Sequence, residues 1–564
     1  EVVAEVFREK GEYRLRVSYR TDLFEEESMK IFAGCYDRTV SEFLTRHSLG
    51  EIDIASEEQL ALLDSFQPPL KDVEGLNDIV SMFRVQAEKH PDAPALIIGE
   101  EKRNYGEIDE VSDRIAWHLR QKDIGRGKVV SILIHRNEYM VKASLGALKS
   151  GAGYQPLDPT YPPERLLFMV NDSEAALVIA DEDLTSLIDG YTGEFLLTKD
   201  IPDLPPVPEN ADLPVPDSHD TFTLLYTSGS TGVPKGVILE HGNLANFCKW
   251  YQKEYDLTEG TVHAAYASYG FDANMMDLYP ALTGGGCVCV VPEDIRLNLP
   301  ALGKYLGDNN VSVAFMTTQV GRQFAVSSYR PACLRSLSVG GEKLAPMAPP
   351  EGIEFYNVYG PTECTILATK KTVDREYLRI PIGHGVAGAA LYVVDSKGRR
   401  VPPCVPGELW IAGRGVGRGY LNRPEKNAES FIANPFCAQE GYDRVYRTGD
   451  VVRFLPNGDV DFIGRSDGQV KIRGFRIELS EIESVIREYP AIEDVTVQAY
   501  DNESGSGKYV AAFIVVKEGE TIAPGALEAF IKQRKPPYMV PSVIMEIDRI
   551  PLNQNQKVDK RKLP

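Results

Sequence analysis

The chain has 564 residues, of which 43% are hydrophobic and 25% charged, proportions typical of a globular protein with several domains. Its 61 basic and 82 acidic side chains leave a net charge of −21, which argues against nucleic acid or an anionic membrane as a partner. The sequence contains no run of about 18 apolar residues, so it predicts no membrane-spanning helix. Eight scattered cysteines without metal-ligand spacing favour free thiols in a cytoplasmic protein.

The first 70 residues differ in pattern from the rest of the chain. Alternating polar and apolar residues at 13–19 predict a strand, and apolar side chains at helical spacing between Met29 and Leu44 predict an amphipathic helix. One strand and one helix cannot bury a core of their own. We therefore expect this segment to pack against another part of the protein, or to be the tail of a domain that lies upstream.

From about residue 75 to 380, helical stretches alternate with short apolar strands at 95–98, 129–134 and 176–180, which predicts a mostly parallel sheet. Six prolines within 201–219 predict a surface loop. Beyond 385 the pattern is typical of β-structure, with strands at 391–395, 407–413 and 459–464. A last unit combines helices at 480–489 and 526–534 with strands at 495–500 and 511–516, and its boundary falls near 464–469.

A string rich in glycine and hydroxyl groups, LLYTSGSTGVPKG, follows an apolar strand at residues 224–236. Its backbone N–H groups and hydroxyls can turn toward phosphate oxygens, and Lys235 adds a positive charge. The GxxxxGK[ST] pattern of P-loop nucleotide triphosphatases does not fit, because Gly236 follows Lys235. The string predicts a phosphate-binding loop of another kind.

Eight strings in order along the chain are similar to the motifs of one family. They are LKSGAGYQPLDP (148–159), YTSGSTGVPKG (226–236), FDANMMDLYPAL (271–282), NVYGPTE (357–363), GELWIAGRGVGRGYLNRPEKNAESF (407–431), YRTGD (446–450), GRSDGQVKIRGFRIELSEIE (464–483) and PLNQNQKVDK (551–560). Over about residues 75–563 the chain resembles the adenylate-forming superfamily, specifically an amino-acid adenylation domain of a nonribosomal peptide synthetase. The resemblance implies a ligase that uses ATP and Mg²⁺ to convert an amino acid to aminoacyl-AMP and pyrophosphate.

The resemblance also implies an α/β multidomain fold in three parts. Residues 1–70 would be the C-terminal remnant of a condensation domain and its linker. Residues 71–466 would form a large adenylation core of βα subdomains plus a β-rich subdomain. Residues 467–564 would form a small, mobile α+β lid, with Asp467 as the hinge and Gly468 easing the change of backbone conformation.

Most of an ATP site follows from the same resemblance. A carboxylate attacks the α-phosphorus while pyrophosphate leaves, so the protein must hold two anions in line. Glu363 would help to hold Mg²⁺, a cation that prefers oxygen ligands. The remaining ligands would be Thr227, Ser228, Gly229, Ser230, Thr231 and Lys235 for the β- and γ-phosphates, Thr362 for the α-phosphate, Asn357 and Tyr359 for adenine, and Asp450 with Arg465 for the ribose.

Lys557 is the expected catalytic residue, although its polar surroundings alone would indicate an ordinary solvated lysine. An ammonium in the cleft can bridge the substrate carboxylate and the α-phosphate where charge builds up in the transition state. The family usually has glycine before this lysine and arginine after the following aspartate. Here Gln556 and Lys560 stand at those positions, and we expect activity to survive with a less flexible loop.

The FDAN string resembles a motif of the family in which the aspartate, here Asp272, pairs with the α-ammonium of the amino acid, and such a partner suits a buried carboxylate. Motif register places the rest of the substrate pocket at Ala273, Met276, Phe315, Ser338, Gly340, Val358, Ile366 and Leu367. None of these side chains is charged, so a charged substrate would lie unpaired among them. We expect a neutral, mainly apolar side chain, with tyrosine allowed if Ser338 meets its hydroxyl.

The resemblance implies a phosphopantetheinylated peptidyl carrier protein as the partner, supplied in trans or by further synthetase sequence. A condensation domain would lie upstream, and the pathway would make an antibiotic or other secondary metabolite. No HHxxxDG string is present, so this chain should not form peptide bonds. Two alternatives are an acyl-CoA or aryl-acid ligase of the same superfamily and a catalytically silent ATP-binding scaffold. Asp272 argues against the first, and the presence of Lys557, Glu363 and Asp450 against the second.

Overall fold

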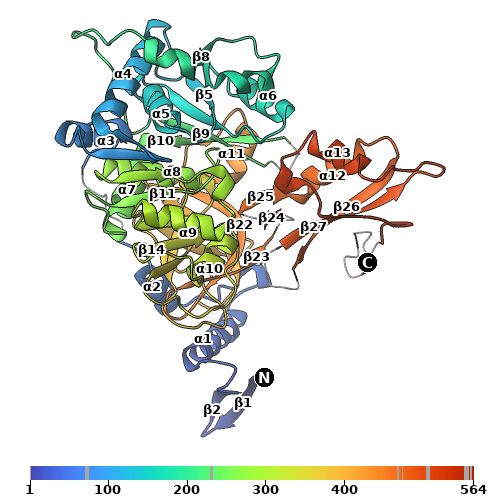
Figure 1. The fold of residues 1–564 in the computed structure, drawn as a ribbon. Coiled ribbons are helices and arrows are strands. Elements are labelled where there is room, and N and C mark those ends of the chain that lie inside the picture. Colours follow the sequence, from blue (N-terminus) through green and yellow to red (C-terminus); the bar gives the residue numbers. More distant parts are fainter. Residues whose placement is uncertain are drawn as a thin grey trace.

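A computed structural model describes residues 2–69, 75–228, 233–466, 469–472, 474–502, 508–551, 558 and 562–564. Figure 1 shows a large body that carries an N-terminal hairpin at one end and a small C-terminal unit at its side. All eight cysteines are free, as the sequence predicts. Within the described ranges, no helix is both long and apolar enough to cross a membrane.

Two large sheets form most of the core. The first has the strand order β20-β10-β9-β6-β5-β7-β8, and β9 pairs with β6 in parallel and with β10 in antiparallel register. Its strands are β5 (Val129–Leu133), β6 (Gly153–Leu157), β7 (Leu177–Ala180), β8 (Phe195–Leu197), β9 (Thr221–Thr227), β10 (Lys235–Glu240) and β20 (Gly419–Tyr420). The β9–β10 hairpin contains the glycine-rich string and therefore fixes both of its ends.

The second sheet has the order β17-β16-β15-β14-β13-β11-β12-β3-β4 and is parallel from β15 to β3. Its strands are β3 (Pro94–Ile98), β4 (Glu101–Asn104), β11 (Val262–Ala265), β12 (Cys287–Val290), β13 (Val313–Thr317), β14 (Ser336–Gly340), β15 (Glu354–Tyr359), β16 (Thr369–Thr372) and β17 (His384–Gly385). Ligands of open parallel sheets bind outside the carboxyl ends of the strands, so the ends of β13, β14 and β15 are the place to look for a site.

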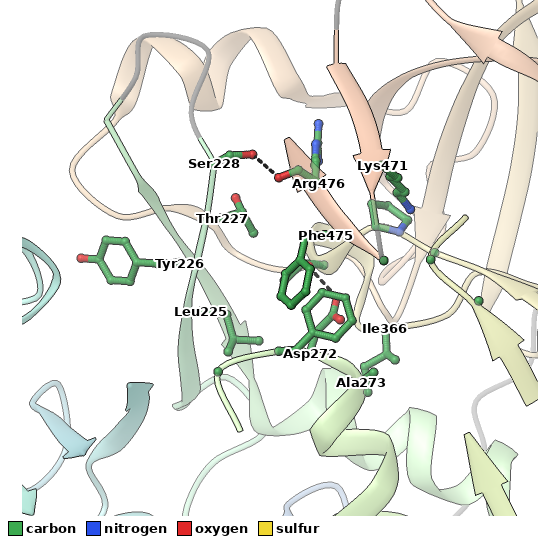
Figure 2. Close-up of a pocket in the computed structure, with 18 of the residues that line it drawn as sticks. Leu225, Tyr226, Thr227, Ser228, Asp272, Ala273, Ile366, Lys471, Phe475 and Arg476 are labelled. Atoms are coloured by element: carbon green, nitrogen blue, oxygen red, sulfur yellow. Dashed lines mark hydrogen bonds between the residues drawn. The ribbon is translucent and has the colours of Figure 1, made fainter. Parts of the chain in front are cut away.

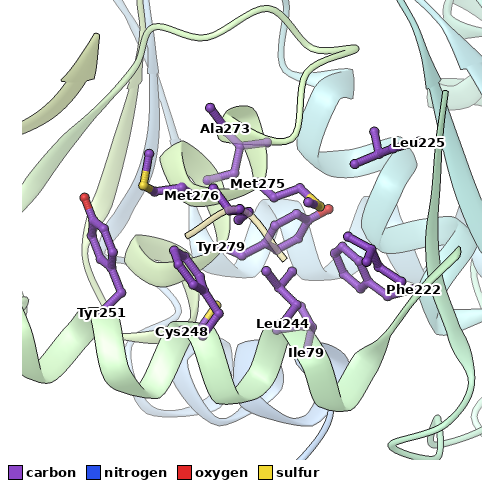
Figure 3. Packing of buried hydrophobic residues seen from close by; sticks show 14 of the residues in the cluster. Ile79, Phe222, Leu225, Leu244, Cys248, Tyr251, Ala273, Met275, Met276 and Tyr279 are labelled. Atoms are coloured by element: carbon purple, nitrogen blue, oxygen red, sulfur yellow. The ribbon is translucent and has the colours of Figure 1, made fainter. Parts of the chain in front are cut away.

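Helices fill the space between these two sheets. Helix α5 packs on β5 and β6, helix α8 packs on β11 and β12, and α3 contacts both helices. Figure 3 shows apolar side chains of α7 and α8 meeting Ile79 of α3 and Phe222 of β9 in one cluster. The core helices are α3 (Ile79–Lys89), α4 (Tyr105–Gln121), α5 (Tyr139–Lys149), α6 (Pro163–Asp172), α7 (His241–Glu254), α8 (Ala273–Thr283), α9 (Leu299–Asp308), α10 (Thr318–Ala325) and α11 (Pro424–Ser430).

Beyond residue 385 the chain forms the β-rich part that the sequence predicts. A sheet of order β18-β19-β22-β21, with β23 paired to β22, completes the core. Its strands are β18 (Ala389–Val394), β19 (Gly407–Gly413), β21 (Phe431–Ala433), β22 (Arg444–Phe454) and β23 (Val460–Arg465). Strand β22 carries Asp450 opposite Arg465 of β23, so antiparallel pairing brings these two side chains together.

The C-terminal unit is a small α+β body with its own hydrophobic cluster. A hairpin of β24 (Gln469–Ile472) and β25 (Phe475–Glu478) leads into α12 (Leu479–Arg487), β26 (Ile492–Asp501), β27 (Lys508–Val516), α13 (Ala526–Lys532) and β28 (Val543–Glu546). Strands β26 and β27 are antiparallel, and β27 and β28 are parallel. The two helices and two strands predicted from the sequence are all present.

The N-terminal segment contains more structure than the sequence indicates. Strand β2 (Glu12–Tyr19) and helix α1 (Glu26–Phe43) lie where the pattern predicts them, but β1 (Val2–Glu9) pairs with β2 and α2 (Glu57–Ser65) follows. Strand β1 has no buried residue, so its sequence lacks the alternation that a half-buried strand shows. The hairpin projects away from the core beyond α1 (Figure 1).

Candidate active site

Two adjoining cavities open at the carboxyl ends of β14 and β15, where the core meets the C-terminal unit. They share five residues, namely Gly341, Val358, Asp450, Arg465 and Lys471. The first cavity is lined by eight of the nine substrate residues that motif register places: Asp272, Ala273, Met276, Phe315, Gly340, Val358, Ile366 and Leu367. Ser338 is not part of this lining, because its hydroxyl pairs with Tyr255 deeper in the core.

Asp272 stands at the N-cap position of α8 and lines the first cavity (Figure 2). Only 9% of it is exposed, and Thr362 donates a hydrogen bond to its carboxylate. Burial raises the pKa of Asp272, while the Thr362 hydrogen bond and the positive charge of Lys471 oppose that rise. A cationic ligand placed beside this carboxylate would restore its ionised form.

Another part of the wall of this cavity is built on unusual backbone. Thr365 and Ile366 follow the short 3₁₀ helix Thr362–Cys364 with φ angles of 58° and 72°. A β-branched residue at positive φ is strained, and such strain is found at sites that need a side chain in a particular place. Here the strained turn directs Ile366 into the cavity (Figure 2).

The second cavity brings together the residues expected to bind adenosine. Asn357, Tyr359, Asp450 and Arg465 all line it. Asp450 accepts a hydrogen bond from the Tyr359 hydroxyl and one from Arg465 at 2.6 Å. Burial, together with the negative charge of Asp450, holds the pKa of the Tyr359 hydroxyl well above its usual value, so this hydroxyl remains a donor.

Part of the expected phosphate loop contributes to the lining of the first cavity. Thr227 pairs with Lys235 across the β9–β10 hairpin, and Thr227 and Ser228 both line the cavity. The Thr227 hydroxyl oxygen is buried and has no hydrogen-bond partner among the described residues, which suits a ligand oxygen or water. Gly229, Ser230 and Thr231 lie outside the described residues.

Lys235 and Glu363 form a buried charged group beside this loop. The Lys235 ammonium lies 3.4 Å from Glu363 Oε1, and Tyr420 donates to the same oxygen at 2.7 Å. Burial alone would raise the pKa of Glu363, but Arg476 and Lys235 outweigh it and hold the pKa well below its usual range. Burial lowers the pKa of Lys235 to about 8, and nearby Arg476 acts in the same direction.

An ionised carboxylate is the kind of ligand that Mg²⁺ binds, so the chemistry of Glu363 fits a magnesium ion. In this arrangement, however, the Arg476 guanidinium donates to both oxygens of Glu363 at 3.2 Å. Arg476 comes from β25 of the C-terminal unit. The docked unit therefore places a protein cation where the resemblance expects a metal ion.

The C-terminal unit supplies other lining residues that sequence reasoning did not assign. Lys471, Gly474 and Phe475 line the first cavity together with Arg476 (Figure 2). The Ser228 hydroxyl donates to the Arg476 carbonyl at 2.7 Å, and the Phe475 ring lies 5.5 Å from that of Phe271. The four lining residues of the C-terminal unit belong to the string GRSDGQVKIRGFRIELSEIE, so this motif could have indicated their place in the site.

A second set of contacts holds this unit against α6. Glu481 of α12 is fully buried and accepts from Lys535 at 2.7 Å and from Arg165 of α6 at 3.5 Å. The backbones of Gly341 and Gly474 are in close contact. A Cβ added to Gly341, whose φ is 98°, would lie 2.8 Å from the Cα of Gly474. The predicted catalytic residue Lys557 and the predicted hinge Asp467 lie outside the described residues.

A large α/β core joined to a small α+β unit, with a glycine-rich hairpin and a buried carboxylate between them, defines an adenylate-forming ligase. The chain matches the AMP-binding enzyme family over residues 83–421 and the AMP-binding enzyme C-terminal domain over residues 481–557. It belongs to that family.

Its relatives are nonribosomal peptide synthetases. Bacitracin synthase 1 of Bacillus licheniformis is 36% identical over 98% of this chain, and surfactin synthase subunit 2 of Bacillus subtilis (strain 168) is 34% identical over 99%. The chain spans 10% and 16% of the lengths of these relatives. A crystal structure of a four-domain nonribosomal peptide synthetase bound to AMP and glycine aligns with all of this chain and 42% of that one, at 29% identity and a TM-score of 0.72.

Proposed function

We propose that this chain activates an amino acid with a neutral, mainly apolar side chain, using ATP and Mg²⁺, and forms aminoacyl-AMP with release of pyrophosphate. The observation that carries the proposal is in the first cavity, where the buried carboxylate of Asp272 lines the wall together with a group of uncharged side chains, namely Ala273, Met276, Phe315, Val358, Ile366 and Leu367. The carboxylate would hold the α-ammonium, and the apolar wall would receive the side chain. The adjoining second cavity would hold the nucleotide.

The remaining residues have roles that suit this reaction. Thr227 and Lys235 would bind phosphate oxygens, Thr362 the α-phosphate, and Asp450 the ribose hydroxyls. Glu363 would bind Mg²⁺, which would shield the phosphate charges, once Arg476 has moved away. Lys557 would bridge the reacting carboxylate and the α-phosphate.

We further propose that the aminoacyl group passes as a thioester to the phosphopantetheine arm of a peptidyl carrier protein in a nonribosomal peptide synthetase. The similarity to bacitracin and surfactin synthases supports this partner. The division into a condensation-domain remnant (1–70), an adenylation core (71–466) and a lid (467–564) belongs to the same proposal. The β1–β2 hairpin supports it, because an isolated two-stranded hairpin is marginally stable without a neighbour.

The test compares an amino acid with the same acid lacking its α-amino group, for example leucine with 4-methylpentanoate, in an ATP–pyrophosphate exchange assay without CoA. The wild type should favour the amino acid strongly. Asp272→Ala should reduce that preference by a factor of about 30 or more, because removing one partner of a buried charge pair costs about 2–5 kcal/mol. Thermal melting serves as the control and should show that the variant is folded.

Equal use of both acids by the wild type would contradict the proposal. CoA-dependent consumption of the acid without the amino group would then favour the acyl-CoA ligase alternative.

A further inference from the structure

An arginine that follows the first large sheet reaches the second one where the loop carrying Asp272 begins. This segment, residues 266–272, connects β11 to α8 and is called the Asp272 loop. Arg136 lies shortly after β5, a strand that pairs in parallel with β6 and β7, and β11 pairs in parallel with β12. The arginine therefore bridges the carboxyl ends of strands from both sheets.

Each nitrogen of the Arg136 guanidinium donates a hydrogen bond to a different backbone carbonyl. Nη2 donates to the oxygen of Ala265 at 2.5 Å, and Nη1 donates to that of Ala267 at 2.7 Å. Nε donates to the oxygen of Val291, directly after β12, at 3.0 Å. Because the donors of a guanidinium form a rigid plane, these bonds fix two strand ends and the first residues of the Asp272 loop relative to one another.

The three carbonyls are the main partners of this buried charge. The Arg136 side chain is 12% exposed, and the carboxylate of Glu293, 3.9 Å from Nε, belongs to a side chain that is 62% exposed. Burial and the nearby Arg296 lower the pKa of Arg136 to about 10, so the guanidinium is still charged at neutral pH. A buried charge is costly unless its hydrogen bonds are satisfied, which favours the backbone arrangement that supplies all three carbonyls.

The Ala267 oxygen connects this arginine to the start of α8. It also accepts a hydrogen bond at 3.2 Å from the side-chain amide of Asn274, a residue of α8 that is 2% exposed. This bond closes the Asp272 loop, because Asp272 lies between Ala267 and Asn274 in the chain and lines the first cavity (Figure 2). A shift of the Ala267 oxygen would therefore move the first turn of α8 and the carboxylate of Asp272 with it.

We infer that Arg136 is a positioning residue for recognition of the substrate α-ammonium, because it holds the Asp272 loop so that the Asp272 carboxylate lies at the first cavity. The inference rests on the proposed function, which assigns the α-ammonium to Asp272. The described lining of that cavity does not include Arg136, so the arginine acts on the substrate through the loop. Loss of its hydrogen bonds should weaken binding of the α-ammonium and leave binding of the nucleotide largely unchanged.

The test measures binding, so that it does not depend on turnover. The probes are two non-hydrolysable sulfamoyl adenosine analogues, one carrying leucine and the other 4-methylpentanoate, which differ only in the α-amino group. Calorimetric titration into the full chain gives the ratio of their affinities. Arg136→Met should lower the preference for the leucine analogue by a factor of about ten or more, because a small misplacement of a binding group has a large effect. Arg136→Lys keeps the charge without the planar fork and should lower it less, and thermal melting shows that each variant is folded.

Two controls separate positioning from a general loss of structure. Arg335 also donates to backbone carbonyls, those of Tyr255 and Asp256 at 2.6 and 2.8 Å, but these follow α7, and Arg335→Met should leave the affinity ratio unchanged. In an Asp272→Ala background the loop carries no carboxylate to position, so Arg136→Met should not lower the ratio further. Equal loss of affinity for both analogues in folded Arg136 variants, or the same fall in the ratio without Asp272, would overturn the inference.

Failure of the proposed function gives a different pattern. Amino-acid-dependent exchange by the wild type, combined with an unchanged affinity ratio in both Arg136 variants, would overturn only the inference. A wild type that prefers the leucine analogue but supports no exchange, combined with the expected fall in the ratio, would overturn the proposed reaction and leave the positioning role in place. Equal affinity of the wild type for both analogues, or binding of neither, would overturn both.

Discussion

Lys235 is a buried lysine of the site whose pKa is lowered by its surroundings. It is 8% exposed, its ammonium lies 3.0 Å from the Tyr420 hydroxyl, and it sits 4.2 Å from the centre of that ring. Glu363 favours its charged form, whereas burial and the positive charges of Arg476 and Lys426 oppose it. The balance leaves a lysine that can lose its proton in the ordinary working range of an enzyme.

This balance predicts a pH dependence for nucleotide binding. With a pKa of about 8, Lys235 is charged below that pH and neutral above it. The KM for ATP should therefore rise as the pH increases from 7 to 9, because the phosphates lose a cationic partner. Steady-state kinetics across this range provide the measurement. Lys235→Gln should show a raised KM at every pH and lack the step near pH 8, and a step of undiminished size in that variant would contradict the assignment.

At the scale of elements, helix α8 is anchored to the end of β11 by one buried carboxyl group. Asp277 accepts hydrogen bonds from the backbone N–H groups of Tyr266 and Ala267 at 2.9 and 2.7 Å. These bonds connect the segment before Asp272 to the helix that begins after it. The loop that carries the expected substrate carboxylate is thereby fixed to the core.

Burial raises the pKa of Asp277 to about 8, so the group is mostly protonated at pH 7. Asp277→Asn preserves an acceptor oxygen and should be tolerated, whereas Asp277→Ala should lower the free energy of unfolding by about 2–4 kcal/mol. Because the unfolded carboxyl ionises near pH 4, the wild type should lose stability relative to Asp277→Asn between pH 4 and pH 8. Urea denaturation of both proteins at several pH values checks this, and a difference that is independent of pH would contradict it.

Helices and strands are predicted well from the sequence where the local pattern of apolar and polar residues determines which side of the element is buried. The strands of the core and the two helices of the C-terminal unit, α12 and α13, follow from periodicity and glycine boundaries. Strand β1 was missed because it has no buried face to produce a pattern. Among the pocket residues, Phe315 and Gly340 line the cavity as motif register places them, but Ser338 lies behind it. That outcome depends on Tyr255, which is 83 residues away and reaches Ser338 only through tertiary packing.

On the scale of the whole molecule, the docked C-terminal unit places the Arg476 guanidinium on Glu363, the carboxylate that we propose as a ligand of Mg²⁺. Arg476 reaches Glu363 only because the β24–β25 hairpin enters the cleft, where Phe475 stacks on Tyr538 at 3.9 Å. Motif spacing could not reveal this, since the contact joins residues 113 positions apart. Binding of Mg²⁺ by Glu363, as we propose, would require the Arg476 guanidinium to leave this position.

Removing Arg476 should shift this competition. Arg476→Ala leaves Glu363 with Lys235 as its charged partner, so binding of Mn²⁺, used as a paramagnetic substitute for Mg²⁺, should tighten in the presence of ATP. The lid should also become more susceptible to limited proteolysis, because a buried charge pair between core and lid has been lost. Electron paramagnetic resonance titration and a protease time course provide the two readouts. Arg375→Ala, a change outside this cluster, serves as the control and should alter neither.

We propose above that this chain converts an amino acid and ATP to an aminoacyl adenylate. Amino-acid-dependent ATP–pyrophosphate exchange, measured across the twenty common amino acids without carrier protein or CoA, tests it most directly. We expect exchange with one or a few neutral, apolar amino acids and none with charged ones. Exchange driven by an aspartate, glutamate, lysine or arginine would contradict the proposed neutral substrate, and folded protein that binds ATP but exchanges with no amino acid would contradict the reaction itself.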